Sequence, residues 1–284
     1  MKPFLIGLCV MGRPRTTDRC LRALREHTDS DLYDLIVLGQ NPSKDVKDVV
    51  KFHAVNYIEN EFNTGIVFGH NAIMSYRQPG QHYIKIDDDC FVMSPNWLET
   101  FANVLQNENV GAAIGRRPSF WLDAPGRKAY FEQYVEVAEI NGVWVEKIES
   151  NGCVGCWWVM KGSVLDDIGP FNEASANDDQ DWNVRANYLG FKSMYVPDVA
   201  IQQMGEELCI HPQSKANYAV IAQNQGIHAM YLDSYKRGKI RLGSKFKGYE
   251  NCDEMYKTLA EKNMDWFRRF KNPDCNLDLT GRIS

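Results

Sequence analysis

Short apolar runs alternate with segments of helical periodicity through the first 115 residues, and this alternation limits the possible folds more than any other feature. A run that is apolar at nearly every position is typical of a strand buried on both faces, as in parallel sheets. Repeated strand–helix–strand units build a mostly parallel sheet with helices on both faces. The predicted strands are residues 4–11, 35–38, 55–58, 83–86 and 110–114.

Capping residues place the helices between these strands. Thr16 or Thr17 is expected to cap a helix that continues to about residue 27. A second helix is predicted at residues 66–76. Ser94 followed by Pro95 is typical of a cap with proline at the first helical position, so a third helix is expected after Pro95.

The pattern loosens after residue 116 and becomes regular again near residue 152. In this part the sequence predicts a hairpin at Asn141-Gly142, a strand within 152–160, a helix at 178–189 ended by Gly190, and a strand at 192–196 closed by Pro197. Residues 212–284 are more polar and helical in pattern, and we expect them to form an extension packed on a main domain of residues 1–211.

Composition and charge are those of an ordinary soluble protein. The chain has 284 residues, 44% of them hydrophobic and 24% charged. A net charge of −5 gives no overall attraction to nucleic acid or membranes. The N-terminal apolar run is short, contains Gly7 and ends in arginines, which fits a first strand better than a signal peptide. No stretch has the roughly 18 apolar residues of a spanning helix, so a cytoplasmic location is expected.

Eight scattered cysteines in a chain without an export signal are expected to be reduced thiols. Cys153 and Cys156 form the single C-x-x-C pair, and Cys209 with His211 would complete a zinc site. However, a strand sends positions three apart to opposite faces, which weighs against zinc at this pair.

Three adjacent carboxylates, Asp87, Asp88 and Asp89, follow the predicted strand at 83–86. Ligands of such sheets lie at the carboxyl ends of the strands. Neighbouring carboxylates repel one another, and a bound cation relieves that repulsion. Oxygen ligands suit Mg²⁺ or Mn²⁺ bridging to phosphates. The alternative is a solvated acidic loop, but the position after a buried strand favours a metal and phosphate site.

A second acidic cluster, at residues 178–181, opens the helix predicted there. Carboxylates at a helix N-terminus are stabilised by its free N–H groups, so capping is the simple alternative. Capping requires one carboxylate, whereas this cluster has three. A carboxylate at this place could also act as a general base toward an acceptor hydroxyl.

The order and spacing of these motifs resemble family 2 glycosyltransferases with the GT-A fold. The resemblance extends from about Phe4 to about His211. It rests on Asn63, Gly65 and Asn71 before the acidic run, on the D-x-D motif at 87–89, on Gly155, on 168–173, on Asp178, Asp179 and Arg185, and on 189–197.

This resemblance implies a metal-dependent enzyme that transfers a hexosyl or pentosyl group from a nucleotide sugar, with a UDP-sugar favoured, by a single inverting displacement. Asp87 would contact the donor ribose and the metal, Asp88 would support the donor loop, and Asp89 would bind Mn²⁺ or Mg²⁺. Asp179 would be the catalytic base, and Asp178 replaces the usual glutamate beside it. The other expected donor contacts are Arg13, Asn41, Asn63, Gly65 and Asn71.

Two positions depart from the family pattern. Many relatives carry an aspartate after the second strand, where this chain has Gln40 and Asn41, so an amide is expected to take its place. Relatives often place a metal-binding histidine soon after the final proline. Here residues 202–204 contain none, and His211 is the candidate ligand.

The acceptor is less constrained by the sequence. Trp157, Trp158 and Trp182 are candidates for stacking on a sugar or acceptor, although core packing explains most tryptophans. Six basic residues form an acid-free stretch that fits either a solvated face or an anionic partner. They are Lys236, Arg237, Lys239, Arg241, Lys245 and Lys247. The acceptor is expected to be a glycan, a lipid-linked molecule or a small molecule, and hydroxylated bases of DNA are an alternative.

Two other classes of protein share part of this pattern. A nucleotidyltransferase would place a glycine-rich phosphate loop after the first strand, and residues 11–15 do not form one. A non-catalytic carbohydrate-binding protein would not require both acidic clusters. Metal-dependent hydrolysis of a nucleotide sugar would separate that class from an enzyme.

Overall fold

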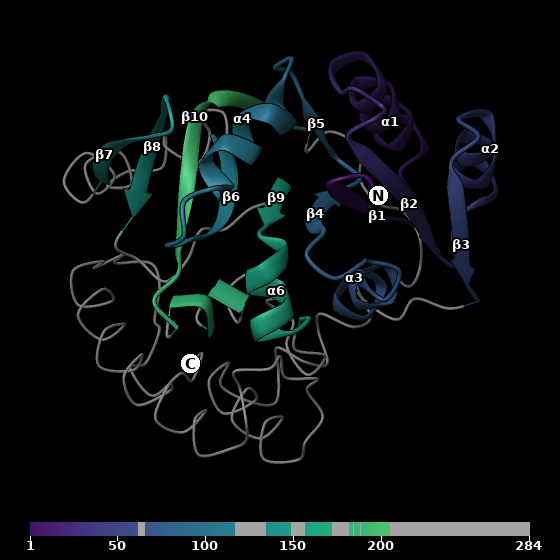
Figure 1. The fold of residues 1–284 in the computed structure, drawn as a ribbon. Helices are drawn as coiled ribbons and strands as arrows, with labels where there is room; N and C mark the ends of the chain where they lie inside the picture. Colours follow the sequence, from purple (N-terminus) through teal and green to yellow (C-terminus); the bar gives the residue numbers. More distant parts are fainter. Residues whose placement is uncertain are drawn as a thin grey trace, which may run out of the picture.

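A computed structural model describes residues 1–61, 66–116, 135–148, 157–171, 182–183, 185–187 and 189–204 (Figure 1). The first half contains β1 (Phe4–Val10), α1 (Pro14–His27), β2 (Tyr33–Gln40), α2 (Lys44–Phe52), β3 (Asn56–Asn60), α3 (Ile66–Met74) and β4 (His82–Asp87). It is followed by β5 (Cys90–Val92), α4 (Trp97–Leu105), β6 (Val110–Arg116), β7 (Val135–Ile140), β8 (Val143–Ile148), β9 (Trp157–Met160), α6 (Gly162–Ile168) and β10 (Lys192–Gln203).

These strands form one mixed sheet in the order β3-β2-β1-β4-β9-β6-β10-β8-β7, and β5 pairs with the end of β10. In Figure 1 the β7–β8 hairpin lies at one end of the sheet, and β3 with α2 lies at the other. Strands β3, β2, β1 and β4 are parallel, as predicted. Strand β9 is antiparallel to both of its neighbours, β4 and β6, which the sequence did not indicate.

Helices cover both faces of this sheet, as the predicted α/β class requires. Side chains of α1, α2 and α4 pack on one face, and those of α3 and α6 pack on the other. All seven residues of β1 are buried. Phe4 and Ile6 point into the first core, whereas Leu5 points into the second. Burial on both faces explains why the run is apolar at successive positions.

The start of α1 differs from the expectation. The helix begins at Pro14 and its N-cap is Arg13, whereas Thr16 and Thr17 lie inside the helix and are buried. Proline at the first helical position needs no N–H partner and already has a helical φ angle. The earlier start places the Arg13 side chain at the entrance of the helix.

Ser94 was also wrongly predicted as a cap. Its hydroxyl donates to the carbonyl of Asp198 at 3.1 Å and accepts from the N–H of Ala200 at 2.8 Å, so it ties the segment after β5 to β10. Helix α4 begins later, after Asn96, which has a φ of 54°. Helix α2 was not predicted, although Ser43 caps it by accepting a hydrogen bond from the N–H of Val46.

The predicted strand at 192–196 does not close at Pro197. Strand β10 continues to Gln203, and its register against β6 shifts between Val196 and Ala200. A proline in a strand is tolerated at such an irregularity because its missing N–H costs no ladder bond there. The extension carries β10 back to the end of β4.

Two predicted turns are confirmed. Asn141 and Gly142 both have positive φ angles, of 49° and 80°, and join β7 to β8 as a tight hairpin requires. Residues 182–183 and 185–187 are helical, and Gly190 follows them with a φ of 90°. The N–H groups of Gly190 and Phe191 donate to Asn187 and Ala186, which is the hydrogen-bond pattern of a glycine-terminated helix.

Cys9, Cys20 and Cys90 are buried thiols, whereas the C-x-x-C pair and the extension predicted at 212–284 lie outside the described residues. None of the described helices is both long and apolar enough to cross a membrane.

Gly7 allows β1 to pass close to β4. A Cβ atom at this position would lie 2.1 Å from the hydroxyl oxygen of Tyr83 and 2.8 Å from the adjacent ring carbon. That hydroxyl is itself 2.7 Å from Nδ1 of buried His70. The glycine that interrupts the first apolar run is therefore required by packing.

We predict that Gly7→Ala lowers the free energy of unfolding by about 1–3 kcal/mol, because the added methyl group has no space beside a buried ring. The midpoint and slope of urea unfolding would measure this change. An unchanged midpoint would show that Tyr83 moves aside without cost.

Candidate active site

The acidic run lies at the carboxyl end of β4, in the middle of the sheet. Asp87 is the last residue of β4, and Asp88 and Asp89 form the turn into β5. The turn is held from its far side by β10, because Gln203 pairs with Cys90 and the N–H of Met204 donates to the Asp89 carbonyl at 2.7 Å. The extension of β10 past its proline thus fixes the backbone of the site.

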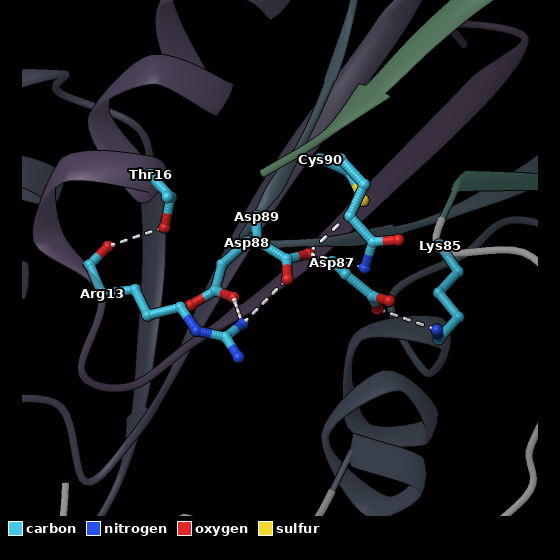
Figure 2. A network of polar contacts seen from close by, with 8 residues as sticks. Arg13, Thr16, Lys85, Asp87, Asp88, Asp89 and Cys90 are labelled. Atoms are coloured by element: carbon cyan, nitrogen blue, oxygen red, sulfur yellow. Dashed lines mark hydrogen bonds and ion pairs between the residues drawn. The ribbon is translucent and has the colours of Figure 1, made fainter. Parts of the chain in front are cut away.

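Arg13 reaches this turn from the connection between β1 and α1 (Figure 2). Its Nη1 lies 2.8 Å from Oδ1 of Asp88 and 3.4 Å from Oδ2 of Asp89. Each of these aspartates is 8% exposed. One guanidinium nitrogen therefore bridges two nearly buried carboxylates.

Lys85 supplies a second cation that the sequence analysis missed. Residues two apart on a strand share a face, so Lys85 lies beside Asp87 on the face covered by α3. Its Nζ donates to Oδ1 of Asp87 at 2.8 Å, and the residue is only 5% exposed (Figure 2). A lysine between two apolar strand residues, as in Ile84-Lys85-Ile86, was the available signal.

Burial and charge shift the pKa values of two groups near this turn. Burial raises the pKa of Asp88 to about 7, against the opposing effect of the Arg13 guanidinium, and the neighbouring carboxylates add to the rise. Burial also lowers the pKa of His70 well below its usual value, and the charge of Lys85 adds to that shift. His70 is therefore neutral beneath the site.

The donor atoms of this turn suit a hard divalent cation. Asp87 and Asp89 offer carboxylate oxygens, and a cationic nitrogen of Arg13 already lies between two carboxylates. Within the described part of the chain, no group of three or more histidine, cysteine, aspartate or glutamate side chains converges to form a complete metal site. Mg²⁺ and Mn²⁺ commonly take one or two protein carboxylates together with substrate phosphates and water, which matches this incomplete set.

The side chain of Asn71, an expected donor contact, bonds the backbone of Phe171. Its Nδ2 donates to the carbonyl of Phe171 at 2.9 Å, and its Oδ1 accepts from the N–H of Phe171 at 2.9 Å. Fully buried Arg185 donates to the carbonyls of Ile168 and Pro170, at 3.0 and 2.7 Å. Two motif side chains thus hold the backbone of one segment, residues 168–171.

The three tryptophans do not line an open face. Trp157 and Trp158 belong to β9, whose two neighbours and two covering layers bury it completely. The Trp157 ring lies 5.0 Å from that of Trp97, and Trp158 contacts Trp182 at 5.2 Å. The expectation of sugar stacking is therefore wrong, because β9 places Trp157 and Trp158 in the core and Trp182 is buried against Trp158.

Amide side chains gather at the carboxyl ends of β2 and β3. Gln40 ends β2, and its Oε1 accepts from Nδ2 of Asn60 at 3.1 Å. Asn41 follows with a φ of 50°, and its N–H donates to the carbonyl of Asn60 at 2.9 Å. The amides expected to replace an aspartate therefore lie at the same edge of the sheet as the acidic run.

Several predicted site residues lie outside the described residues. These are Asn63, Gly65, Asp178, Asp179, His211 and the basic side chains Lys236, Arg237, Lys239, Arg241, Lys245 and Lys247.

The central sheet with helices on both faces matches the GT-A glycosyltransferase fold of known structures. The model of the family described as glycosyl transferase family 2 matches residues 6–169, which is more than half of the chain. The protein belongs to this family.

Solved structures of low sequence identity share the fold. A mannosyltransferase from Pyrobaculum calidifontis in complex with GDP-Man and Mn²⁺ aligns with a TM-score of 0.59 and 12% identity, over 93% of this chain and 75% of that one. S. aureus TarS 1-349 in complex with UDP-GlcNAc aligns with a TM-score of 0.58 and 11% identity, over 95% and 74%. GalNAc-T7 with UDP, GalNAc and Mn²⁺ gives 0.57 and 12%, over 96% and 57%. Comparison with curated protein sequences finds no match.

We predict that Lys85→Met lowers the free energy of unfolding by about 2–4 kcal/mol, because Asp87 loses the partner that stabilises its charge next to the core. The matched control is Lys47→Met, which breaks the exposed pair with Glu59. That change should cost less than about 1 kcal/mol. Equal effects of the two substitutions in urea unfolding would contradict a buried role for Lys85.

Proposed function

We propose that this glycosyltransferase moves a sugar from a nucleoside diphosphate sugar, favoured to be a UDP-sugar, to an acceptor hydroxyl with inversion at the anomeric carbon. The observation that carries the proposal is the arrangement at the end of β4, where three carboxylates are flanked by Arg13 and Lys85. Carboxylates suit a divalent cation, and cations suit a diphosphate. The acceptor would be a glycan, a lipid-linked molecule or a small molecule.

The described residues take distinct parts in donor binding. Asp87 would accept hydrogen bonds from the ribose hydroxyls, with its carboxylate oriented by Lys85. Asp89 would hold the divalent ion, Mn²⁺ or Mg²⁺. Such an ion, when bound, supplies positive charge that stabilises the leaving diphosphate. Arg13 would contribute further positive charge on the opposite side of the turn.

An amide at the base position supports UDP as the donor nucleotide. Uracil presents one N–H donor between two carbonyl acceptors, and a side-chain amide offers both an acceptor and a donor to such an edge. Guanine presents adjacent donors, which a carboxylate accepts better than an amide does. Asn41, at the end of β2, is the residue proposed to meet the base.

The chemical step is proposed to rest on the second acidic cluster. Asp179 would take the proton from the acceptor hydroxyl as the oxygen attacks the anomeric carbon from the face opposite the diphosphate. One displacement inverts that carbon. Asp178 would support the base. Arg185 and Asn71 hold the backbone of residues 168–171, which precede this cluster in sequence.

We predict that UDP-sugars with Mn²⁺ raise the melting temperature by several degrees, and that GDP-sugars raise it less. A ligand that binds only the folded state stabilises it by about 2.7 kcal/mol at a hundredfold excess over its dissociation constant. A thermal-shift series with UDP-, GDP- and dTDP-sugars, each with Mn²⁺ and with EDTA, measures this effect. A shift produced by GDP-sugars alone would contradict the choice of nucleotide.

We predict that Asp179→Asn reduces kcat by about 10²–10⁴-fold, since the amide cannot accept the proton. Donor binding should be unchanged, because the substitution is isosteric and removes no proposed donor contact. Sugar transfer and isothermal titration with the donor measure the two effects. Full transfer activity with normal donor binding would show that another group is the base.

A further inference from the structure

The bridging guanidinium of Arg13 occupies the position between two carboxylates that a metal ion would compete for. Its Nη1 contacts Asp88 at 2.8 Å and Asp89 at 3.4 Å. Arginine remains charged at every accessible pH, so it cannot make way by losing a proton. A Mg²⁺–oxygen bond is about 2.1 Å long, so an ion on the nearer oxygen of Asp89 would lie close to a positive nitrogen. The guanidinium has to move for the ion to bind well.

The two cations of the site differ in their freedom to move. The Lys85 side chain is 6% exposed and lies between the sheet and α3. The Arg13 side chain is 29% exposed, compared with 11% for each of the two aspartates that it contacts. Arg13 thus approaches the turn from the open side, whereas Lys85 is enclosed.

We propose that Arg13 is an exchangeable counter-ion, which neutralises Asp88 and Asp89 in the absence of metal and turns to the donor diphosphate when metal and donor bind. This inference rests on the proposed function. The diphosphate offers negative charge to the displaced guanidinium, which the metal alone cannot do. Metal and nucleotide therefore bind synergistically, and Arg13 carries part of the coupling free energy.

The alternative is a permanent structural pair. In that case Arg13 would remain on Asp88 in every state, and its removal would destabilise the protein without changing the affinity for metal. The two possibilities predict opposite outcomes for metal binding in the absence of nucleotide.

The test is a titration with Mn²⁺, with and without UDP or GDP. Electron paramagnetic resonance measures the free ion at each step. For wild type we expect weak binding that tightens on addition of nucleotide. Arg13→Gln should bind Mn²⁺ alone at least about tenfold more tightly than wild type, a change of ~1.4 kcal/mol, and should gain less from nucleotide. Arg13→Lys keeps the charge and should retain weak binding of Mn²⁺ alone.

A second readout is thermal stability. Without Arg13, Asp88 and Asp89 lose the cation that contacts both of them, so Arg13→Gln should melt lower than wild type in EDTA and gain more from Mn²⁺. If Arg13→Gln does not fold, Arg13→Met replaces it in both measurements, because methionine keeps the apolar part of the side chain. Arg22→Gln is the control, since it removes an equal charge from an exposed pair with Asp18 elsewhere on α1. It should leave Mn²⁺ binding unchanged.

Each result decides between these accounts. If wild type and Arg13→Gln bind Mn²⁺ alone with equal affinity, the exchange is wrong and the proposed function stands. If neither protein binds Mn²⁺ even with UDP or GDP present, the metal-dependent function itself is overturned, and the exchange with it.

Discussion

Asp87, Asp88 and Asp89 place three adjacent carboxylates at one turn, where Asp88 and Asp89 are nearly buried and Asp87 is partly exposed. Burial raises the pKa of Asp88, the neighbouring carboxylates add to the rise, and the Arg13 guanidinium opposes it. Lys85 pairs with Asp87 on the other side of the turn. The two cations come from different elements: Lys85 lies in β4, and Arg13 lies at the N-terminus of α1.

The backbone of the turn depends on strands that are distant in the sequence. Strand β10 passes its proline by a shift in register and pairs with β5, so that the acidic turn is fixed at both ends. Strand β9 lies antiparallel between β4 and β6 and fills the middle of the sheet with tryptophan side chains. The carboxyl end of β4 therefore lies inside the sheet, and paired strands hold the acidic turn that follows it.

The sequence predicted the parallel part of the fold because the signal there is local. A run such as residues 4–11 has no polar side to expose, and the acidic run follows such a strand directly. The antiparallel insertion of β9 could not be predicted in this way. An apolar strand buried on both faces has the same composition in either direction, so direction is decided by the connections on each side. For the same reason Trp157 and Trp158 gave no sign of whether they faced a ligand or a core.

Side-chain partners were harder to predict than strands. Lys85 resembles an ordinary strand lysine until its depth and the position of Asp87 are known. Ser94 has the sequence of a cap, yet its hydroxyl bonds two backbone groups of β10. The Ser94 bonds join residues about a hundred positions apart, and local propensity carries no information about them.

Asn71 and Arg185 show that a motif residue need not touch a ligand. Each belongs to the pattern by which the family is recognised, and each bonds the backbone of residues 168–171. Buried backbone groups without partners are costly, and this segment begins at the end of α6, where the last carbonyls have no partner within the helix. An amide and a guanidinium satisfy these groups with fixed geometry. The order of motifs in the sequence therefore records the supports of the site as well as its ligands, whereas the carboxylates themselves are contacted directly by Arg13 and Lys85.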